Sequence, residues 1–223
     1  MKIKGVIFDL DGTLIDSMSV WDRVDHEFLS KRGIAVPEDL FADIEEGNSF
    51  IEVARYFKEK FSLADSIEEI ISEWTSLVSG HYENDIRLKP GVNEFLELLK
   101  SKQIKIGLGT SNSLLLATKV LKANSVFDYF DAIVTGCKEI KGKPYPDIFL
   151  KVAEELKISP EACLVCEDVV AGIQAGKNAG MMVMGIYDSY SLADKEKICQ
   201  EADYYAEDFY RIKEYCLDHN LFL

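Results

Sequence analysis

The sequence lacks both a long hydrophobic run and a surplus of positive charge. No stretch of its 223 residues approaches the roughly 18 consecutive apolar residues that a membrane-spanning helix needs. Lys and Arg number 25 against 39 Asp and Glu, which gives a formal net charge of −14. Because nucleic acids and anionic membrane surfaces are bound through Lys and Arg, we expect neither of them as a partner.

Cysteine is also scarce. An odd number of cysteines without a secretory signal indicates reduced thiols, and Asp9 interrupts the N-terminal apolar stretch before a signal peptide could form. Two of the cysteines, Cys163 and Cys166, have CxxC spacing, but they lie in an apolar strand-like run and are interpreted as core residues. We therefore expect a cytoplasmic protein without an obligate protein partner. The five cysteines are Cys137, Cys163, Cys166, Cys199 and Cys216.

What the sequence does contain is an alternation of short apolar runs and amphipathic segments of helix length. Continuous apolar strands that alternate with helices are typical of a doubly wound parallel sheet, so we predict an α/β protein with a Rossmann-like core. The predicted strands span residues 4–10, 104–111, 131–136, 162–168, 182–188 and 202–209, and the predicted helices span residues 91–102, 113–123, 147–157, 170–179 and 208–218.

Residues 17–88 break this alternation, because they contain no convincing strand. Three apolar stripes with helical spacing begin at Val20, Ile51 and Ile67. The stretch is too long for a crossover between two strands, so we predict that it forms an inserted α-helical cap domain. The core domain would then consist of residues 1–16 and 89–223.

Polar side chains follow several predicted strands at the sheet edge where open α/β sheets bind ligands. Carboxylates, hydroxyls and one ammonium group are expected to meet there. They are Asp9 and Asp11 after the first strand, Thr110, Ser111 and Asn112 after the second, Lys143 in the loop after the third, and Glu167 and Asp168 after the fourth.

Asp9 and Asp11 stand two positions apart in the stretch VIFDLDGTLID, residues 6–16. On an extended chain both side chains face the same way, and two bare carboxylates raise each other's pKa. A divalent cation removes this conflict, and Mg²⁺ prefers one or two carboxylates together with substrate phosphate. We predict that Asp168, with Glu167, completes the protein ligands of Mg²⁺. One carboxylate could then attack phosphorus while the other transfers protons.

The remaining polar residues at this edge suit a phosphate group. The hydroxyl of Thr110, the backbone N–H of Ser111 and the ammonium of Lys143 would hold the non-bridging oxygens, with Asn112 beside them. The predicted partner is therefore a small phosphorylated metabolite.

Four motifs, in order, resemble the signature motifs of the haloacid dehalogenase superfamily: DLDGT, a strand ending in Thr-Ser, KGKPYPDIF and EDVVAGIQAG. The resemblance spans residues 4–187, and the helical stretch resembles the small cap of the branch with β-phosphoglucomutase and small-molecule phosphatases. It implies that Asp9 is the nucleophile and that Asp11 is the acid/base, with its backbone carbonyl on Mg²⁺. It further implies that Thr110 binds phosphate, Lys143 steadies the phosphoryl charge and Asp168 binds the metal, and it leaves open whether Glu167 is a direct ligand.

The cap should decide which substrate enters. By alignment, Trp21 and Phe50 stand where the mutase carries a His and an Arg, so a clamp for a second phosphate is missing. We therefore favour a phosphomonoester hydrolase acting on a sugar or polyol phosphate, with a phosphomutase as the alternative. A non-enzymatic phospho-aspartate receiver domain is a remote alternative, because such domains are shorter and lack a cap. Trp21, Asn48, Ser49 and Phe50 are the candidate specificity residues, although Trp21 could equally pack in the cap core.

Overall fold

The chain is described by a computed structural model that covers residues 2–37, 40–41, 49–136 and 141–222. Its centre is a six-stranded sheet of order β3-β2-β1-β4-β5-β6 in which all neighbouring strands are parallel. This order confirms the predicted doubly wound, Rossmann-like sheet. The strands are β1 (Gly5–Phe8), β2 (Lys105–Thr110), β3 (Ala132–Thr135), β4 (Cys163–Glu167), β5 (Met182–Ile186) and β6 (Tyr204–Ala206).

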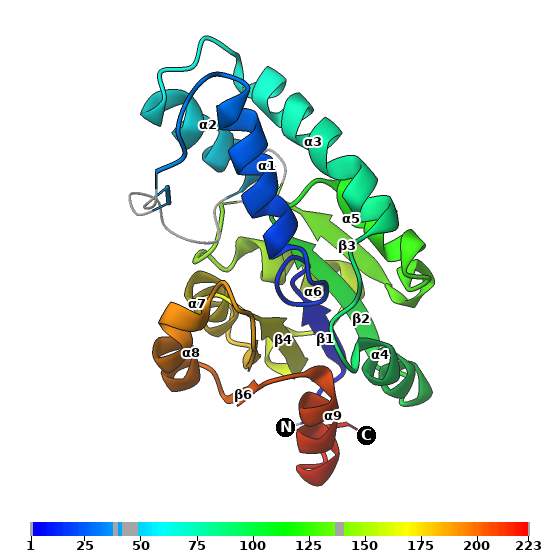
Figure 1. The fold of residues 1–223 in the computed structure, drawn as a ribbon. Coiled ribbons are helices and arrows are strands. Elements are labelled where there is room, and N and C mark those ends of the chain that lie inside the picture. Colours follow the sequence, from blue (N-terminus) through cyan, green and yellow to red (C-terminus); the bar gives the residue numbers. More distant parts are fainter. Residues whose placement is uncertain (1, 38–39, 42–48, 137–140, 223) are drawn as a thin grey trace.

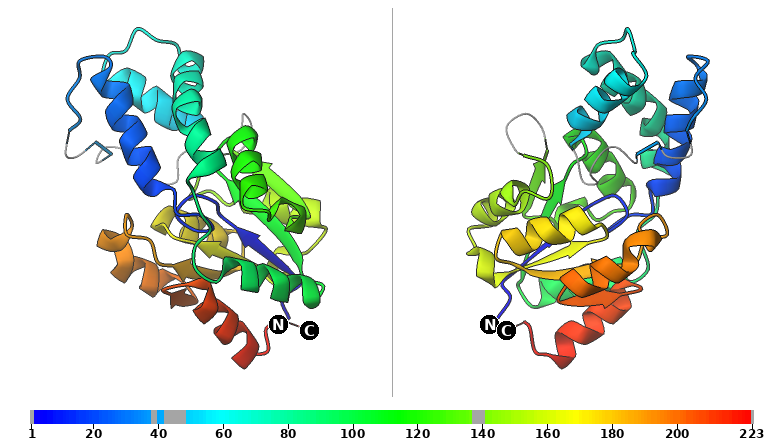
Figure 2. Two further views of the ribbon diagram at one scale, coloured as in Figure 1. Left: turned by 45° about the vertical axis from the view of Figure 1, so that its right-hand side comes forward. Right: turned by 90° about the vertical axis from the view of Figure 1, so that its left-hand side faces the viewer.

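Helices cover both faces of this sheet (Figure 2). Alternate residues of β1 point to opposite faces, so Phe8 packs with α4, α5 and α9, whereas Ile7 packs with α6 and α7. The strands GVIF in β1 and CLVCE in β4 are buried throughout, and apart from the terminal Glu167 they are apolar because both of their faces are covered. These helices are α4 (Val92–Ser101), α5 (Leu114–Ala123), α6 (Asp147–Leu156), α7 (Val170–Asn178), α8 (Lys195–Glu201) and α9 (Phe209–Asp218).

The predicted edge strand near the C-terminus is present as β6, but the structure differs from the sequence prediction in its length and in one further helix. The predicted strand 202–209 is only Tyr204–Ala206, because α9 begins at Phe209. Helix α8 was not predicted at all, since its seven residues bury only Ile198 and therefore carry no apolar stripe. Both differences lie far along the chain from the polar strand ends.

Three helices lie between β1 and α4 in the chain and stand away from the layered core in Figure 1. We call α1 (Met18–Ser30), α2 (Phe50–Lys60) and α3 (Ile67–Asn84) the cap helices. Their buried sides follow the predicted stripes, with Phe28, Phe57 and Trp74 packed edge to face at 4.9–6.1 Å. None of the helices within the described residues is long and apolar enough to cross a membrane. The domain boundaries at 16/17 and 88/89 remain predictions.

The segments that enter and leave the cap helices run side by side. Ile15 and Leu88 form an antiparallel bridge, and the backbone N–H of Asp16 donates to the carbonyl of Arg87 at 3.0 Å. A second backbone hydrogen bond joins the two segments, because the N–H of Lys89 donates to the carbonyl of Leu14 at 3.0 Å. The cap helices are therefore attached to the core by a paired stem directly beside the end of β1.

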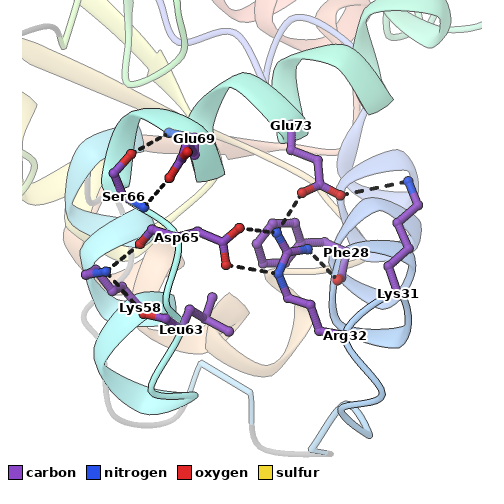
Figure 3. Close-up of polar contacts among 9 residues, drawn as sticks. All are labelled: Phe28, Lys31, Arg32, Lys58, Leu63, Asp65, Ser66, Glu69 and Glu73. Atoms are coloured by element: carbon purple, nitrogen blue, oxygen red, sulfur yellow. Dashed lines mark hydrogen bonds and ion pairs between the residues drawn. The ribbon is translucent and has the colours of Figure 1, made fainter.

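A polar cluster joins the cap helices at the end away from this stem (Figure 3). The Arg32 guanidinium lies 2.8 Å from Asp65 Oδ1 and 2.7 Å from Glu73 Oε2, and it covers the Phe28 ring at 3.7 Å from the centroid. We call Arg32, Asp65 and Glu73 the Arg32 cluster. It ties the end of α1 to α3 and to the loop before it, where Ser66 and Glu69 form a capping box at the start of α3.

Candidate active site

The end of β1 places Asp9 at the centre of the polar edge. Its backbone N–H donates to the carbonyl of Cys166 in β4 at 3.0 Å, and its carboxylate Oδ1 lies 2.6 Å from Lys143 Nζ. Lys143 also donates to Glu167 at the end of β4. We call Asp9, Lys143, Glu167 and Asp168 the Lys143 cluster; all four side chains are buried. The structure thus brings together residues from three strand ends, as the sequence predicted.

Electrostatics in the Lys143 cluster are unbalanced. Burial raises the pKa of Asp9 to about 7, because the nearby Lys143 ammonium offsets only part of the effect of burial and of Glu167. Burial, with Glu167 and Asp9 as further causes, raises the pKa of Asp168 well above its ordinary value. For Lys143, burial acts to lower the pKa, but the two carboxylates raise it above the usual range. Asp9 and Glu167 therefore share one ammonium group in a buried space, and Asp168 adds a third carboxyl group beside them.

Two glycines allow this close packing. Gly12 has a φ of +79°, and a Cβ at this position would lie 2.3 Å from Asp168 Oδ2. The neighbouring Thr13 hydroxyl donates to Asp168 Oδ1 at 2.5 Å. In α7, a Cβ on Gly172 would lie 1.9 Å from Glu167 Oε1. The glycines of DLDGT and EDVVAGIQAG thus make room for the two adjacent acids.

Glu167 has both carboxylate oxygens engaged by the protein. Oε1 accepts from Lys143, and Oε2 accepts from the backbone N–H groups of Asp168 at 2.8 Å and Val169 at 3.2 Å. These contacts make Glu167 a partner of Lys143 in the structure. Its predicted role as a metal ligand remains a prediction.

Asp11 lies beside the Lys143 cluster and is held by other residues. Its Oδ1 accepts from the Ser17 hydroxyl at 2.7 Å, from Trp21 Nε1 at 3.3 Å and from the Tyr82 hydroxyl. Its Oδ2 accepts from the Asn112 side-chain amide at 2.9 Å. Trp21 and Tyr82 come from α1 and α3, so the cap helices fix the orientation of the second acid of the DLDGT motif.

The residues that follow β2 have different hydrogen-bond partners. Thr110 is buried and its hydroxyl accepts from the backbone N–H of Asn112 at 3.0 Å. The Asn112 amide donates to Asp11 and to the Tyr82 hydroxyl, each at 2.9 Å. The structure therefore connects the Asn112 side chain with Asp11, whereas phosphate binding by Thr110, Ser111 and Asn112 remains a prediction.

A cavity of about 430 Å³ lies between this edge and the cap helices. Trp21 lines the cavity and also packs against Phe50, with ring centroids 5.5 Å apart. It therefore lies both in the cavity wall and against the cap core, and its role in specificity remains a prediction. Ser49 does not line it; its hydroxyl accepts from the N–H of Glu52 at 3.3 Å and caps α2. Asn48 lies outside the described residues. The cap side of the cavity is lined by Met18, Trp21, Asp22, Asp25, Phe41, Phe50, Val53 and Trp74.

Comparisons with known proteins agree with this geometry. A family model described as a haloacid dehalogenase-like hydrolase matches residues 3–180. The chain belongs to the haloacid dehalogenase-like hydrolase family. It is 33% identical over 179 residues to a phosphorylated carbohydrates phosphatase of Thermotoga maritima, covering 80% of this chain and 82% of that one. It is 35% identical over 198 residues to the β-phosphoglucomutase of Bacillus subtilis, covering 82% and 83%.

A solved structure extends the match to the fold. The β-phosphoglucomutase of Clostridium difficile superposes with a TM-score of 0.80 at 29% identity, covering 97% of this chain and 96% of that one. The sequence prediction of a phosphatase in the haloacid dehalogenase-like family is therefore confirmed at the level of the family, and a phosphomutase also occurs among the relatives.

Phosphatases of the haloacid dehalogenase-like family generally use Mg²⁺, and the residues present here fit such an ion. The buried carboxyls of Asp9 and Asp168 are hard oxygen ligands with surplus negative charge, the environment that Mg²⁺ prefers. Among the described residues no group of three or more Asp, Glu, His or Cys side chains is placed so that it could hold a metal ion, so the fit rests on Asp9 and Asp168 alone. This arrangement suits an ion that keeps water and substrate oxygens among its ligands.

Sequence reasoning missed two residues of this haloacid dehalogenase-like site. Tyr82 continues the buried stripe of Ile70, Trp74 and Val78 by one more turn, so a stripe that ends in Tyr could have indicated a buried hydroxyl that needs a partner. Asp25 follows Val24 on the buried side of α1 and lines the cavity. The sequence signal available for Asp25 was an acid directly beside an apolar helical stripe.

Proposed function

We propose that this protein is a Mg²⁺-dependent phosphatase that hydrolyses a phosphomonoester of a small metabolite, such as a sugar or polyol, through a phospho-aspartate at Asp9. The observation that carries this proposal is the buried Asp9 carboxylate 2.6 Å from Lys143 Nζ, at the base of a cavity that Asp11 also lines. The two acids of the DLDGT motif have different partners, which supports different roles for them.

In the first step an Asp9 oxygen attacks phosphorus, the bond to the ester oxygen breaks, and Asp11 donates a proton to the leaving alcohol. Lys143, with Thr110 and Ser111, would hold the non-bridging oxygens. In the second step Asp11 removes a proton from water, which attacks phosphorus, releases phosphate and restores the Asp9 carboxylate. Held by Asp9, Asp168 and the Asp11 carbonyl, Mg²⁺ would neutralise the charge that gathers around the phosphoryl group.

A phosphomutase is the second candidate, and the match to the Bacillus subtilis enzyme favours it. A mutase must also hold a second phosphate on the same substrate. Lys143 is the one basic residue among the described lining residues of the cavity, and it is already paired with two carboxylates. The cap side offers Trp21 and Phe50 instead of a cation, which supports the hydrolase.

The decisive experiment measures phosphate release with Mg²⁺ from a panel of sugar, polyol and nucleotide monophosphates. We expect release from at least one of them, and Asp9→Asn should lower kcat by about 10³-fold or more while circular dichroism remains unchanged. Asp128→Asn, which alters an exposed carboxyl outside the cavity, is the matched control. Isomerisation of β-glucose 1-phosphate with a bisphosphate primer, without free phosphate, would reverse the order of the two candidates.

A further inference from the structure

A carboxylate on the cap side of the cavity lacks a partner. Asp25 is 8% exposed and lines the cavity, yet no described residue donates a hydrogen bond to it or forms an ion pair with it. Its nearest charged influence is Asp22, a like charge that adds to the effect of burial. A buried carboxylate is normally paired, so the missing partner of Asp25 points to a group that enters the cavity.

The surroundings of Asp25 suit a cation. Met18, Asp22 and Asp25 are spaced four and three residues apart, so they share one face of α1 toward the cavity. Aromatic rings complete the wall, with Trp21 against Phe50 and Phe50 against Trp74 at centroid distances of 5.5 Å. Aromatic faces attract an ammonium group through their quadrupole, and this attraction adds to that of the carboxylate.

The charge of the cavity lining also favours a cationic ligand. Its described lining holds six carboxyl groups and the single base Lys143, which the Lys143 cluster already engages. A leaving group with a second phosphate or a carboxylate would meet only repulsion on this side. The six carboxyl groups belong to Asp9, Asp11, Asp22, Asp25, Glu167 and Asp168.

We propose that the cap side of the cavity selects phosphomonoesters whose leaving group carries a protonated amine, which Asp25 and the aromatic wall bind. This inference rests on the proposed phosphatase function. A hydroxyl would supply a hydrogen bond to Asp25 but no charge, whereas an ammonium group supplies both. Asp25 lies one helical turn beyond Trp21, the contact of Asp11, or about 6 Å along α1. The amine therefore belongs two or more carbon atoms from the ester oxygen.

The test compares three phosphomonoesters of one size at pH 8 with Mg²⁺: ethanolamine phosphate, 2-hydroxyethyl phosphate and phosphoglycolate. We expect kcat/KM to fall in that order, by about tenfold at each step. A second series uses glucosamine 6-phosphate and glucose 6-phosphate, with the amine further from the ester. Equal rates within both series, or faster hydrolysis of the hydroxyl compounds, would overturn the inference.

A variant tests whether Asp25 causes the preference for amines. Asp25→Asn should reduce the amine-to-hydroxyl ratio of kcat/KM by about tenfold. Glu27→Gln, on the same helix but outside the cavity and paired with Lys31 at 2.9 Å, should keep the wild-type ratio. An unchanged ratio in Asp25→Asn overturns the role of Asp25, and if that variant does not fold, the wild-type series decide alone.

p-Nitrophenyl phosphate separates the two proposals. If the wild-type enzyme hydrolyses it but shows no preference for amines, the inference fails and the phosphatase stands. If neither this ester nor any member of the two series releases phosphate, the proposed function fails and the inference fails with it.

Discussion

Two clusters in this molecule place one basic side chain between two acids, and their surroundings differ. In the Arg32 cluster the side chains are 19–32% exposed, and Lys31 lies 3.9 Å from Glu73 as a second base. In the Lys143 cluster the Lys143, Asp9 and Glu167 side chains are 0–9% exposed, and Asp168 adds a third acid rather than a second base. Similar ion pairs thus occur once near solvent, where water screens the charges, and once in the interior, where a further buried acid lies beside them.

This difference separates a structural contact from a chemical site. The Arg32 cluster is partly exposed to solvent, and it lies at the junction of α1 with α3, where it can hold the cap helices together without a ligand. The Lys143 cluster raises the pKa of both Asp9 and Asp168, which indicates that a further positive charge belongs there. Asp25, on the helix that leads to Arg32, resembles the Lys143 cluster, because no cation among the described residues pairs with it.

The largest effect is expected from Lys143→Met, which removes the base of the buried cluster. Without metal, the free energy of unfolding should fall by about 3–5 kcal/mol, because two buried acids lose their partner. Urea unfolding with a chelator measures this change. Lys151→Met breaks an exposed pair with Glu154 and should leave the free energy of unfolding nearly unchanged. Equal effects of the two variants would contradict the distinction between the clusters.

A pH effect of intermediate size is expected at Asp25. Its pKa of about 7 in the folded protein exceeds the ordinary value of 3.8, so the folded state binds more protons and wild-type stability falls as the pH rises from about 4 to 7. Asp25→Asn removes this contribution. Between pH 5 and pH 8 the variant should gain about 2 kcal/mol in unfolding free energy relative to wild type. Parallel pH profiles of the two proteins would show that Asp25 titrates normally.

Local sequence patterns predicted the sheet well, because each strand is a continuous apolar run whose polar residues follow at its end. They also brought Asp9, Lys143 and Asp168 together, since parallel strands end at one edge. The sequence patterns could not predict which residue donates a hydrogen bond to each acid. The hydroxyl of Tyr82 reaches Asp11 across 71 positions, and only the packing of α3 over the stem creates that contact.

The same limit applies to the cap. Ser49 was predicted to contact substrate, because it lies in a break between cap helices. The structure instead places it at the start of α2, where it forms a capping box with Glu52 and lies outside the cavity lining. For Asp25 the sequence offered only an acid beside the apolar stripe of α1, a pattern that does not show whether the side chain is buried. Phe41, Phe50 and Trp74 line the same cavity as Asp25, and these segments come together only in the folded chain.

Tyr82→Phe sharpens the comparison at the point where cap and core meet. The variant keeps the ring but removes the hydroxyl that donates to Asp11, so Asp11 is positioned less well for proton transfer. We expect kcat to fall by about tenfold, or about 1.4 kcal/mol, with KM nearly unchanged and with the larger losses for poor leaving groups. Tyr145→Phe, at a ring that is 53% exposed, is the control. A uniform loss for good and poor leaving groups would assign Tyr82 a purely structural role.

The smallest effect is expected from Arg32→Ala in the partly exposed Arg32 cluster. The variant loses the contacts with Asp65 and Glu73 and the stacking on Phe28, which together stabilise the cap by about 1 kcal/mol. Because these charges are partly exposed, the loss measured by urea unfolding should shrink at high salt, whereas that of Lys143→Met should persist. Turnover should be retained, since Arg32 does not line the cavity. A loss as large as that of Lys143→Met, or one insensitive to salt, would mean that burial does not distinguish the two clusters.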